Sequence, residues 1–328
     1  MLAFIIRRIL QAIVVMLAVG LIAFSLFNFV GDPINSLVGI DTPLDEREKL
    51  REQLGLNDPF PIQFARFVFN GVQGDFGLSY RMSEPVMDVI ASRLPATVEL
   101  SFVAAVMALV VGVGLGVFTG LYPRSPASRF FLTVSLIGVS LPTFLIGILL
   151  ILVFAVWLNV LPSFGRGEVV QIGWWSSGFF TSSGLSAMIL PAITLGLFQL
   201  TLIMRLVRSE MLEVMRTDYI KFARARGLTD RAINFGHALK NTLVPVITIT
   251  GLQLGAIIAF AIITETVFSW PGMGQLFIQS VQSVDIPVMA TYLVLIALFF
   301  VVINLAVDLL YYAVDPRLRL DSLGKGGH

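Results

Sequence analysis

The feature that most constrains this chain is a series of long apolar stretches that are almost free of charge. Ile9 to Val30 contains no charged residue, and Val98 to Leu121 contains only Glu99, at its edge. The hydrocarbon core of a bilayer is about 30 Å thick and needs roughly 20 apolar residues of helix to cross it. Because backbone polar groups must be satisfied inside that core, each such stretch predicts a transmembrane α-helix.

Six stretches meet this requirement, which predicts an all-α integral membrane protein with about six transmembrane helices. Hydrophobic residues make up 56% of the chain and charged residues 13%, and a soluble protein would carry far more charge. Pro142 is expected to kink or start the third span. Four glycines in the second span predict that it packs closely on another helix: Gly112, Gly114, Gly116 and Gly120. The expected spans are about 9–30, 98–121, a helix within 130–161, 186–204, 243–263 and 288–310.

Lysine and arginine are concentrated in segments that fall on one side of a six-span protein. Residues 205–240 hold eight basic against four acidic residues, whereas residues 31–97, on the other side, hold six basic against ten acidic residues. Because cytoplasmic loops retain positive charge, both termini are predicted to be cytoplasmic. Arg7 and Arg8 before an apolar run are also typical of a signal peptide, but the length of the run and its lack of a small-residue cleavage site favour an uncleaved helix.

The segment 31–97, on the predicted outer side, has helix signals of its own. Thr42 and Pro43 are typical of a helix start, as cap and first-turn proline, and Gly55 is expected to end that helix. Residues 57–61 (NDPFP) then turn the chain. Two interpretations stay open for this loop: a docking surface for an outer partner, or a scaffold that packs on the ends of the spans.

The predicted cytoplasmic segment 209–241 combines apolar periodicity with basic charge. Its apolar residues recur at helical spacing, which predicts that one face packs while the basic residues stay in water. Gly227 is expected to stop this helix at a positive φ, and Thr229 or Asp230 to cap a second, short helix. A docking lever and a basic amphipathic loop lying on anionic lipid both fit this pattern. The face expected to pack comprises Met211, Leu212, Met215, Tyr219, Phe222 and Ala223, and the wet side chains are Arg216, Lys221 and Arg224.

Residues 216–255 (RTDYIKFARARGLTDRAINFGHALKNTLVPVITITGLQLG) resemble the cytoplasmic signature of the permease subunits of bacterial dipeptide, oligopeptide and nickel ABC importers. The general importer signature is a Glu-Ala-Ala triplet, a glycine four residues later and an Ile-x-Leu-Pro element. Ala223, Gly227 and Leu239 hold this spacing. The departures are Lys221 for glutamate, Phe222 for alanine, His237 for isoleucine and Lys240 for proline, and they are of the kind that the peptide-permease branch shows.

The resemblance extends over nearly the whole chain. Similar proteins begin with an Arg-Arg flanked helix and share a series of short motifs that are strong only together. These motifs are GDP (31–33), LGLNDP (54–59), GDFGLS (74–79), RLPATVEL (93–100), SLPTF (140–144), FSWPGMG (268–274) and DLLYYAVDPR (308–317).

The resemblance implies the type I ABC importer permease fold, with an extended periplasmic loop after the first helix. It divides the chain into a first transmembrane helix (1–30), a periplasmic segment (31–97) and a permease core (98–320) that includes the coupling segment 209–241. By analogy, the residues that couple to an ATP-binding subunit are Ala223, Arg224, Ala225, Gly227, Leu228, Asp230, His237, Leu239 and Asn241. The candidates for the translocation pathway are Gln253, Thr264 and Asn304.

The resemblance also implies the setting of the protein. The expected location is the bacterial inner membrane, in contact with lipid. The expected partners are a homologous second permease subunit, two ATP-binding subunits and a periplasmic substrate-binding protein. ATP and magnesium would be held by the ATP-binding subunits and no cofactor by this chain. Dipeptide, longer peptide, glutathione, nickel chelate and opine-like cargo all stay open.

The sequence carries no pattern for chemistry of its own. Gly324-Lys325-Gly326 lacks the spacing and the hydroxyl residue of a phosphate-binding loop. With no cysteine and two histidines, neither a thiol nucleophile nor a metal site is expected, and a net charge of +1 indicates no nucleic-acid partner. An intramembrane enzyme would need a paired Asp, Ser–His or HExxH constellation at membrane depth. An ion-coupled secondary transporter, the other alternative, would bury several charges near the midplane.

Overall fold

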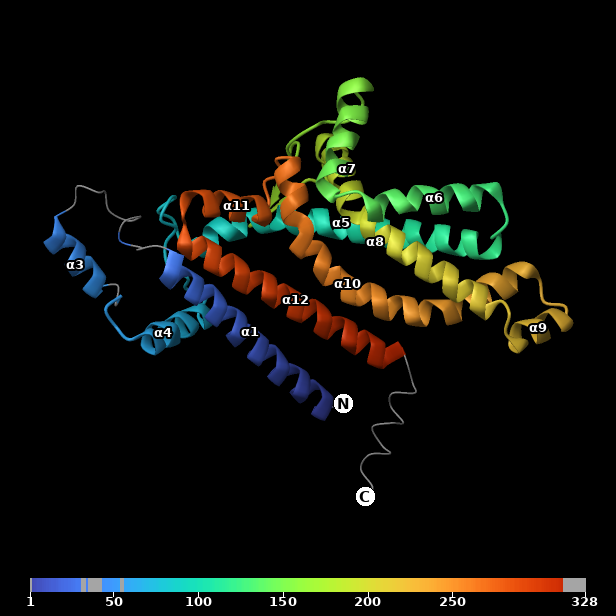
Figure 1. The fold of residues 1–328 in the computed structure, drawn as a ribbon, viewed down its shortest axis with the longest axis horizontal. Coiled ribbons are helices and arrows are strands. Elements are labelled where there is room, and N and C mark those ends of the chain that lie inside the picture. Colours follow the sequence, from blue (N-terminus) through green and yellow to red (C-terminus); the bar gives the residue numbers. More distant parts are fainter. Residues whose placement is uncertain (1, 31–33, 35–42, 54–55, 315–328) are drawn as a thin grey trace, which may run out of the picture.

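The computed structural model describes residues 2–30, 34, 43–53 and 56–314, and these are mostly helical (Figure 1). The helices are α1 (Leu2–Val30), α3 (Leu44–Gln53), α4 (Phe60–Val72), α5 (Val86–Leu121), α6 (Pro126–Ser140), α7 (Thr143–Leu150), α8 (Ser182–Val214), α9 (Asp218–Ala225), α10 (Leu239–Val267), α11 (Met273–Ser283) and α12 (Ile286–Val314). Two π-helical stretches are η1 (Ile151–Trp157) and η2 (Ala232–Ala238). A short antiparallel hairpin pairs β1 (Val170–Ile172) with β2 (Trp175–Ser177).

Several helices are long and apolar enough to cross a membrane. Among the described residues, α1, α5, α8 and α12 each meet this test by length and composition. The pair formed by α6 and α7–η1 meets it jointly but bends through 116°, and Pro142 stands at the N-cap of α7, as expected. In α10 the apolar stretch found among the described residues is shorter, Gly255–Val267. All six expected spans fall within these helices. That the protein crosses the membrane six times stays a prediction.

The centre of the molecule is the pair α5 and α8, which cross along a row of glycines. A Cβ at Gly116 would overlap Val207, and a Cβ at Gly120 would overlap Met211. Small residues at this spacing let two membrane helices approach closely. Gly112 packs on Ile203 in the same row, whereas Gly114 faces open space, so the close packing expected at Gly114 is wrong.

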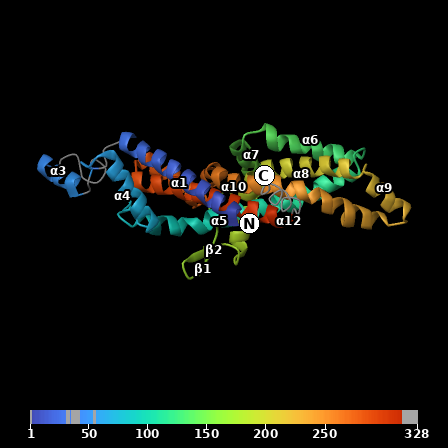
Figure 2. The ribbon, with the colours of Figure 1, turned by 90° about the horizontal axis from the view of Figure 1, so that it is seen from below.

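The other long helices are layered beside this pair. Figure 1 shows α10 between α8 and α12, with α1 along the outer side of α12, and the contacts between these helices agree. Both views place α3 and α4 at one end of the elongated molecule and α9 at the other (Figure 2). The segments predicted to lie on opposite sides of the membrane are therefore far apart.

Some expected boundaries differ from the structure. The second span was expected from residue 98, but α5 begins at Val86 and continues through Pro95. The fifth span was expected to end at residue 263, but α10 continues to Val267 and includes Glu265, which is fully buried. Helix α3 lies where a polar helix was expected, and the start and stop signals assigned to Thr42 and Gly55 lie outside the described residues. Residues 315–317 of the DLLYYAVDPR motif, and Gly324, Lys325 and Gly326, also lie outside them.

Candidate functional site

The segment after α8 is a helix, a tight break and a second helix, with Gly227 at the break. Gly227 has φ +78°, in the left-handed region expected for it. Its N–H donates to the carbonyl of Arg224 (2.9 Å), and the N–H of Leu228 donates to the carbonyl of Ala223 (3.3 Å). This pair of bonds is the Schellman arrangement, which satisfies carbonyls at the end of a helix. Gly227 therefore ends α9 and turns the chain.

The second helix is capped by Thr229, which was one of the two expected cap residues. The N–H of Ala232 donates to the Thr229 hydroxyl (3.4 Å), and the N–H of Ile233 donates to the Thr229 carbonyl (3.0 Å). This helix is not a separate short one, because η2 (Ala232–Ala238) runs directly into α10. No break residue separates Ala238 from Leu239, so the turn at Gly227 is joined to a helix that continues to Val267.

One side of the segment packs against the rest of the molecule. Ile220, Ala223, Ile233 and Ala238 are buried in a cluster that includes Met211, Val207 and Val246 from the long helices, and Leu239 packs partly against it. Tyr219 and Phe222 are 42% and 63% exposed, so their expected place on the packed face is wrong. The expectation assumed one helix from residue 211 to residue 223. The structure ends α8 at Val214 and starts α9 at Asp218, which shifts the phase of the buried face.

The other side presents apolar and basic side chains to the surroundings. We call this exposed set the 218–241 surface. It comprises Tyr219, Phe222, Leu228 and Phe235 together with Arg224, Arg226, Arg231 and His237. The Arg226 guanidinium lies 5.7 Å from the centre of the Phe222 ring, close enough for a cation–π contact. The surface thus combines exposed apolar side chains with three arginines, and Asp218 and Asp230 are exposed in the same segment.

The structure brings most of the predicted coupling residues onto or beside this surface. Arg224, Ala225, Gly227, Leu228, Asp230, His237 and Asn241 are exposed, whereas Ala223 is buried and Leu239 half-buried. The amide nitrogen of Asn241 donates to the His237 carbonyl (2.9 Å) and to the Tyr219 hydroxyl (3.1 Å). Asn241 therefore ties α9 to the start of α10.

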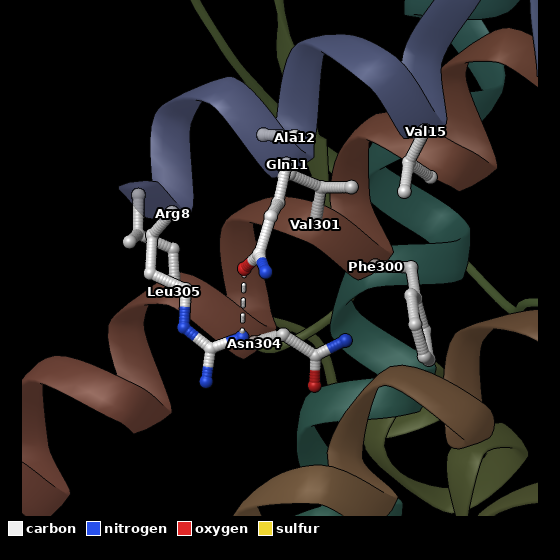
Figure 3. Close-up of a pocket in the computed structure, with 8 residues that line it drawn as sticks. All are labelled: Arg8, Gln11, Ala12, Val15, Phe300, Val301, Asn304 and Leu305. Carbon is white, nitrogen blue, oxygen red and sulfur yellow. Dashed lines mark hydrogen bonds between the residues drawn. The ribbon is translucent and has the colours of Figure 1, made fainter. Parts of the chain in front are cut away.

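Two of the three pathway candidates lie on α10 and one lies on α12. The Gln253 carbonyl accepts a hydrogen bond from the amide of Gln199 on α8 (3.4 Å). Thr264 is buried, and its hydroxyl has no partner among the described residues. Asn304 instead lines a pocket of about 160 Å³ between α1 and α12, beside Arg8 and Gln11 (Figure 3). Phe300 and Val307, about one turn before and after Asn304, pack on Gly255 and Gly251 of α10, so a shared pathway role for the three candidates stays a prediction.

Buried polar groups that no sequence pattern predicts to pair hold several segments of the molecule together. Glu99 and Arg166 form an ion pair of 2.7 Å, with 2% and 7% of their side chains exposed. The Trp175 indole N–H (3.1 Å) and the Gly178 N–H (3.1 Å) also donate to this carboxylate. Arg166 donates in turn to the Ser176 carbonyl (2.6 Å). The pair therefore fastens the β1–β2 hairpin to α5.

A second buried carboxylate, that of Glu265, joins three helices. It accepts hydrogen bonds from the Thr97 hydroxyl on α5 (2.5 Å) and from the N–H of Gln275 on α11 (3.0 Å). A Cβ at Gly272 would overlap this carboxylate. Gly272 of the FSWPGMG motif thus allows the loop to close over Glu265.

A third tie involves Asp285, in the turn before α12. Asp285 accepts hydrogen bonds from the Ser79 hydroxyl (2.5 Å) and the Tyr80 N–H (3.1 Å). Burial, with a smaller contribution from the Asp285 carboxylate, raises the pKa of the Tyr80 phenol to about 12. The loop before α5 is therefore fixed to the α11–α12 turn.

Two family models match the chain and together cover nearly all of it. Residues 112–320 match the binding-protein-dependent transport system inner membrane component. Residues 1–101 match the N-terminal part of the same kind of membrane component. The chain belongs to this family of importer permeases. As the membrane component, the permease is not the ATPase of its transport system, and the expected class of protein is confirmed.

Named relatives and a solved structure agree with this assignment. The permease is 36% identical to the dipeptide transport system permease protein DppB of Alkalihalophilus pseudofirmus, over 97% of its own length and 100% of the relative's. It is 35% identical to the glutathione transport system permease protein GsiC of Escherichia coli, over 97% and 99%. A chain of the MetNI methionine ABC transporter, in an inward-facing conformation, superposes with a TM-score of 0.56 at 22% identity, covering 71% of the permease and all of that chain. The expected type I importer fold is confirmed.

Proposed function

We propose that the permease forms half of the pathway of an ATP-driven importer for peptides or similar small solutes. The relatives that match over the whole chain are named for dipeptide and glutathione transport, which supports this class of cargo. In this proposal a homologous second permease subunit completes the pathway, and a periplasmic binding protein delivers the solute. Two ATP-binding subunits hold ATP and magnesium, and both termini lie in the cytoplasm.

The observation that carries the proposal is the continuity between the 218–241 surface and α10. Exposed apolar side chains accompanied by three arginines suit an apolar groove that carries acidic groups on a partner. Because η2 runs into α10 without a break, a movement of this surface would move the helix that carries Gln253 and Thr264. ATP-driven closure of the partner subunits would in this way reach the pathway.

A photo-crosslink tests the contact with the ATP-binding subunit. Replacing Phe222 by benzoylphenylalanine keeps an exposed aromatic side chain on the 218–241 surface. Irradiation of the assembled complex should join the permease to an ATP-binding subunit, seen as a shifted band identified by mass spectrometry.

The matched control places the same probe at Phe69 on α4, which is 68% exposed at the opposite end of the molecule. Position 69 should give no adduct with the ATP-binding subunit. Equal crosslinking from both positions, or none from position 222, would contradict the proposed contact.

A further inference from the structure

Helix α4 has two apolar faces, of which only one is covered by the rest of the protein. On the covered face, the rings of Phe60, Phe64 and Phe67 lie 5.3 to 5.8 Å from the ring of Phe24 on α1. Gly20 lies one turn before Phe24, and a Cβ there would touch Phe64. This face fixes α4 against the end of α1 that is farther from the N-terminus (Figure 1).

The polar side chains of α4 form a separate stripe. The amide of Gln63 donates to the carbonyls of Leu56 (2.9 Å) and Asp58 (2.7 Å). Arg66, one turn later, pairs with the Asp58 carboxylate (2.5 Å) and is about half exposed. These contacts hold the polar stripe toward the preceding turn and fix the rotation of the helix about its axis.

The second apolar face of α4 has no cover among the described residues. Ile62, Phe69 and Val72 are 51%, 68% and 84% exposed, and Ala65 is exposed between them. Steps of three, four and three residues place these four side chains on one side of a helix. A contiguous apolar stripe of this kind marks a contact surface rather than a face in water.

The position of α4 indicates which surface covers it. The apolar window of α1 runs over Ile6–Ser25, and only 11% of it is buried within the protein. Phe24 lies in the last turn of that window, so α4 is level with the end of a candidate membrane span. Leu21 and Ile22, beside the part of α1 that α4 covers, are themselves 41% and 60% exposed. The uncovered face of α4 therefore lies level with the end of a candidate span whose own apolar side chains are exposed.

We propose that α4 is an interfacial helix that lies in the membrane–water boundary. Its Ile62–Ala65–Phe69–Val72 face inserts between the acyl chains of phospholipid, and the stripe with Gln63 and Arg66 faces the headgroups and water. A helix with separate apolar and polar sides binds a bilayer surface in this way. The bilayer thus holds the start of the segment that leads to α5. The proposal does not depend on the cargo, and the proposed topology places this surface in the outer leaflet.

Spin labels can locate the two faces because the chain contains no cysteine. Phe69→Cys and Asn70→Cys, each carrying a nitroxide, are compared in the assembled importer in phospholipid nanodiscs, with cysteines of the partner subunits replaced. Asn70 continues the stripe of Gln63 and Arg66 in steps of three and four residues, and consecutive residues of a helix lie about 100° apart, so the pair differs mainly in the face that is labelled. Collision rates with oxygen, which concentrates in lipid, and with a neutral nickel chelate, which concentrates in water, are read from power saturation.

The label at position 69 should be relaxed mainly by oxygen and the label at position 70 mainly by the nickel chelate, at least three-fold apart in the ratio of the two rates. Nickel-dominated relaxation at both positions would show a face in water and overturn the proposal. Shielding of position 69 from both reagents, lifted when the second permease subunit is left out, would also overturn it, because the occupant would be that subunit.

Discussion

At the scale of single residues, Gly227 has the clearest physical role. Its φ of +78° places it where a side chain is strained, although a Cβ there would meet no other atom within 4 Å. The cost of any substitution therefore comes from the backbone and not from a clash. For most residues the left-handed conformation costs about 1 kcal/mol or more relative to glycine.

The first prediction compares Gly227→Ala with Gly236→Ala. Gly236 also faces open space, but its φ is not positive, so the same methyl group is added without backbone strain. Gly227→Ala should raise the free energy of the left-handed turn by about 1 kcal/mol, which shifts the equilibrium between this turn and other conformations roughly five-fold. Both solute uptake and stimulation of the ATPase by the loaded binding protein should fall.

Gly236→Ala should leave both activities near those of the natural protein. Asparagine tolerates the left-handed region better than alanine, so Gly227→Asn should retain more uptake than Gly227→Ala, and Gly227→Val less. Normal uptake and normal ATPase stimulation in Gly227→Val would remove the coupling role from this turn.

At the scale of secondary-structure elements, buried polar ties decide where the short segments sit. The β1–β2 hairpin is only three residues per strand and has exposed apolar side chains, so its own packing holds it weakly. Its attachment to α5 depends on Arg166 and Glu99, which are both almost fully buried. A buried ion pair of this kind contributes little relative to an apolar pair, but losing one partner leaves an uncompensated charge.

The second prediction is a double-mutant cycle on this ion pair. Glu99→Leu leaves the Arg166 guanidinium buried without its carboxylate and should destabilise the permease by about 3–5 kcal/mol. Arg166→Met should have an effect of similar size. The double variant should recover a large part of that loss, because neither charge remains, but not all of it, because the Trp175 and Gly178 N–H groups lose their acceptor. Thermal unfolding in detergent, followed for all four proteins, measures the coupling, and additive losses in the double variant would show that the two groups act independently.

At the scale of the whole molecule, the two polar ends of the protein are separated by its long helices. Segments 31–97 and 209–241 carry opposite balances of charge, and α3 and α9 lie at opposite ends (Figures 1 and 2). The positive balance of the second segment favours the cytoplasm. The orientation proposed for the permease follows from that asymmetry.

Single cysteines test this orientation in the intact cell. Asn57→Cys, before α4, should react with an impermeant thiol reagent in intact cells. Ala127→Cys, in the first turn of α6, should react only after the cells are made permeable. Both positions are exposed, so a difference in labelling reports the side of the membrane and not burial. Labelling of position 127 but not of position 57 in intact cells would reverse the topology.

The sequence alone determined the features that depend on a few neighbouring residues. Apolar run length indicated the long helices, Pro142 marked the start of α7, and Gly227 with Thr229 marked the break. Each of these signals acts through backbone geometry or through contact with a membrane, so no distant partner is needed.

Only the tertiary structure decided which side chains meet. Glu99 and Arg166 are 67 residues apart, and Thr97 and Glu265 are 168 apart, so no periodic pattern in the sequence joins them. The exposure of Tyr219 and Phe222 depended on the turn between α8 and α9, which resets the helical phase. The local sequence does not distinguish a carboxylate near a span end that faces water from one that is buried against a partner. The packing of other helices supplies that partner.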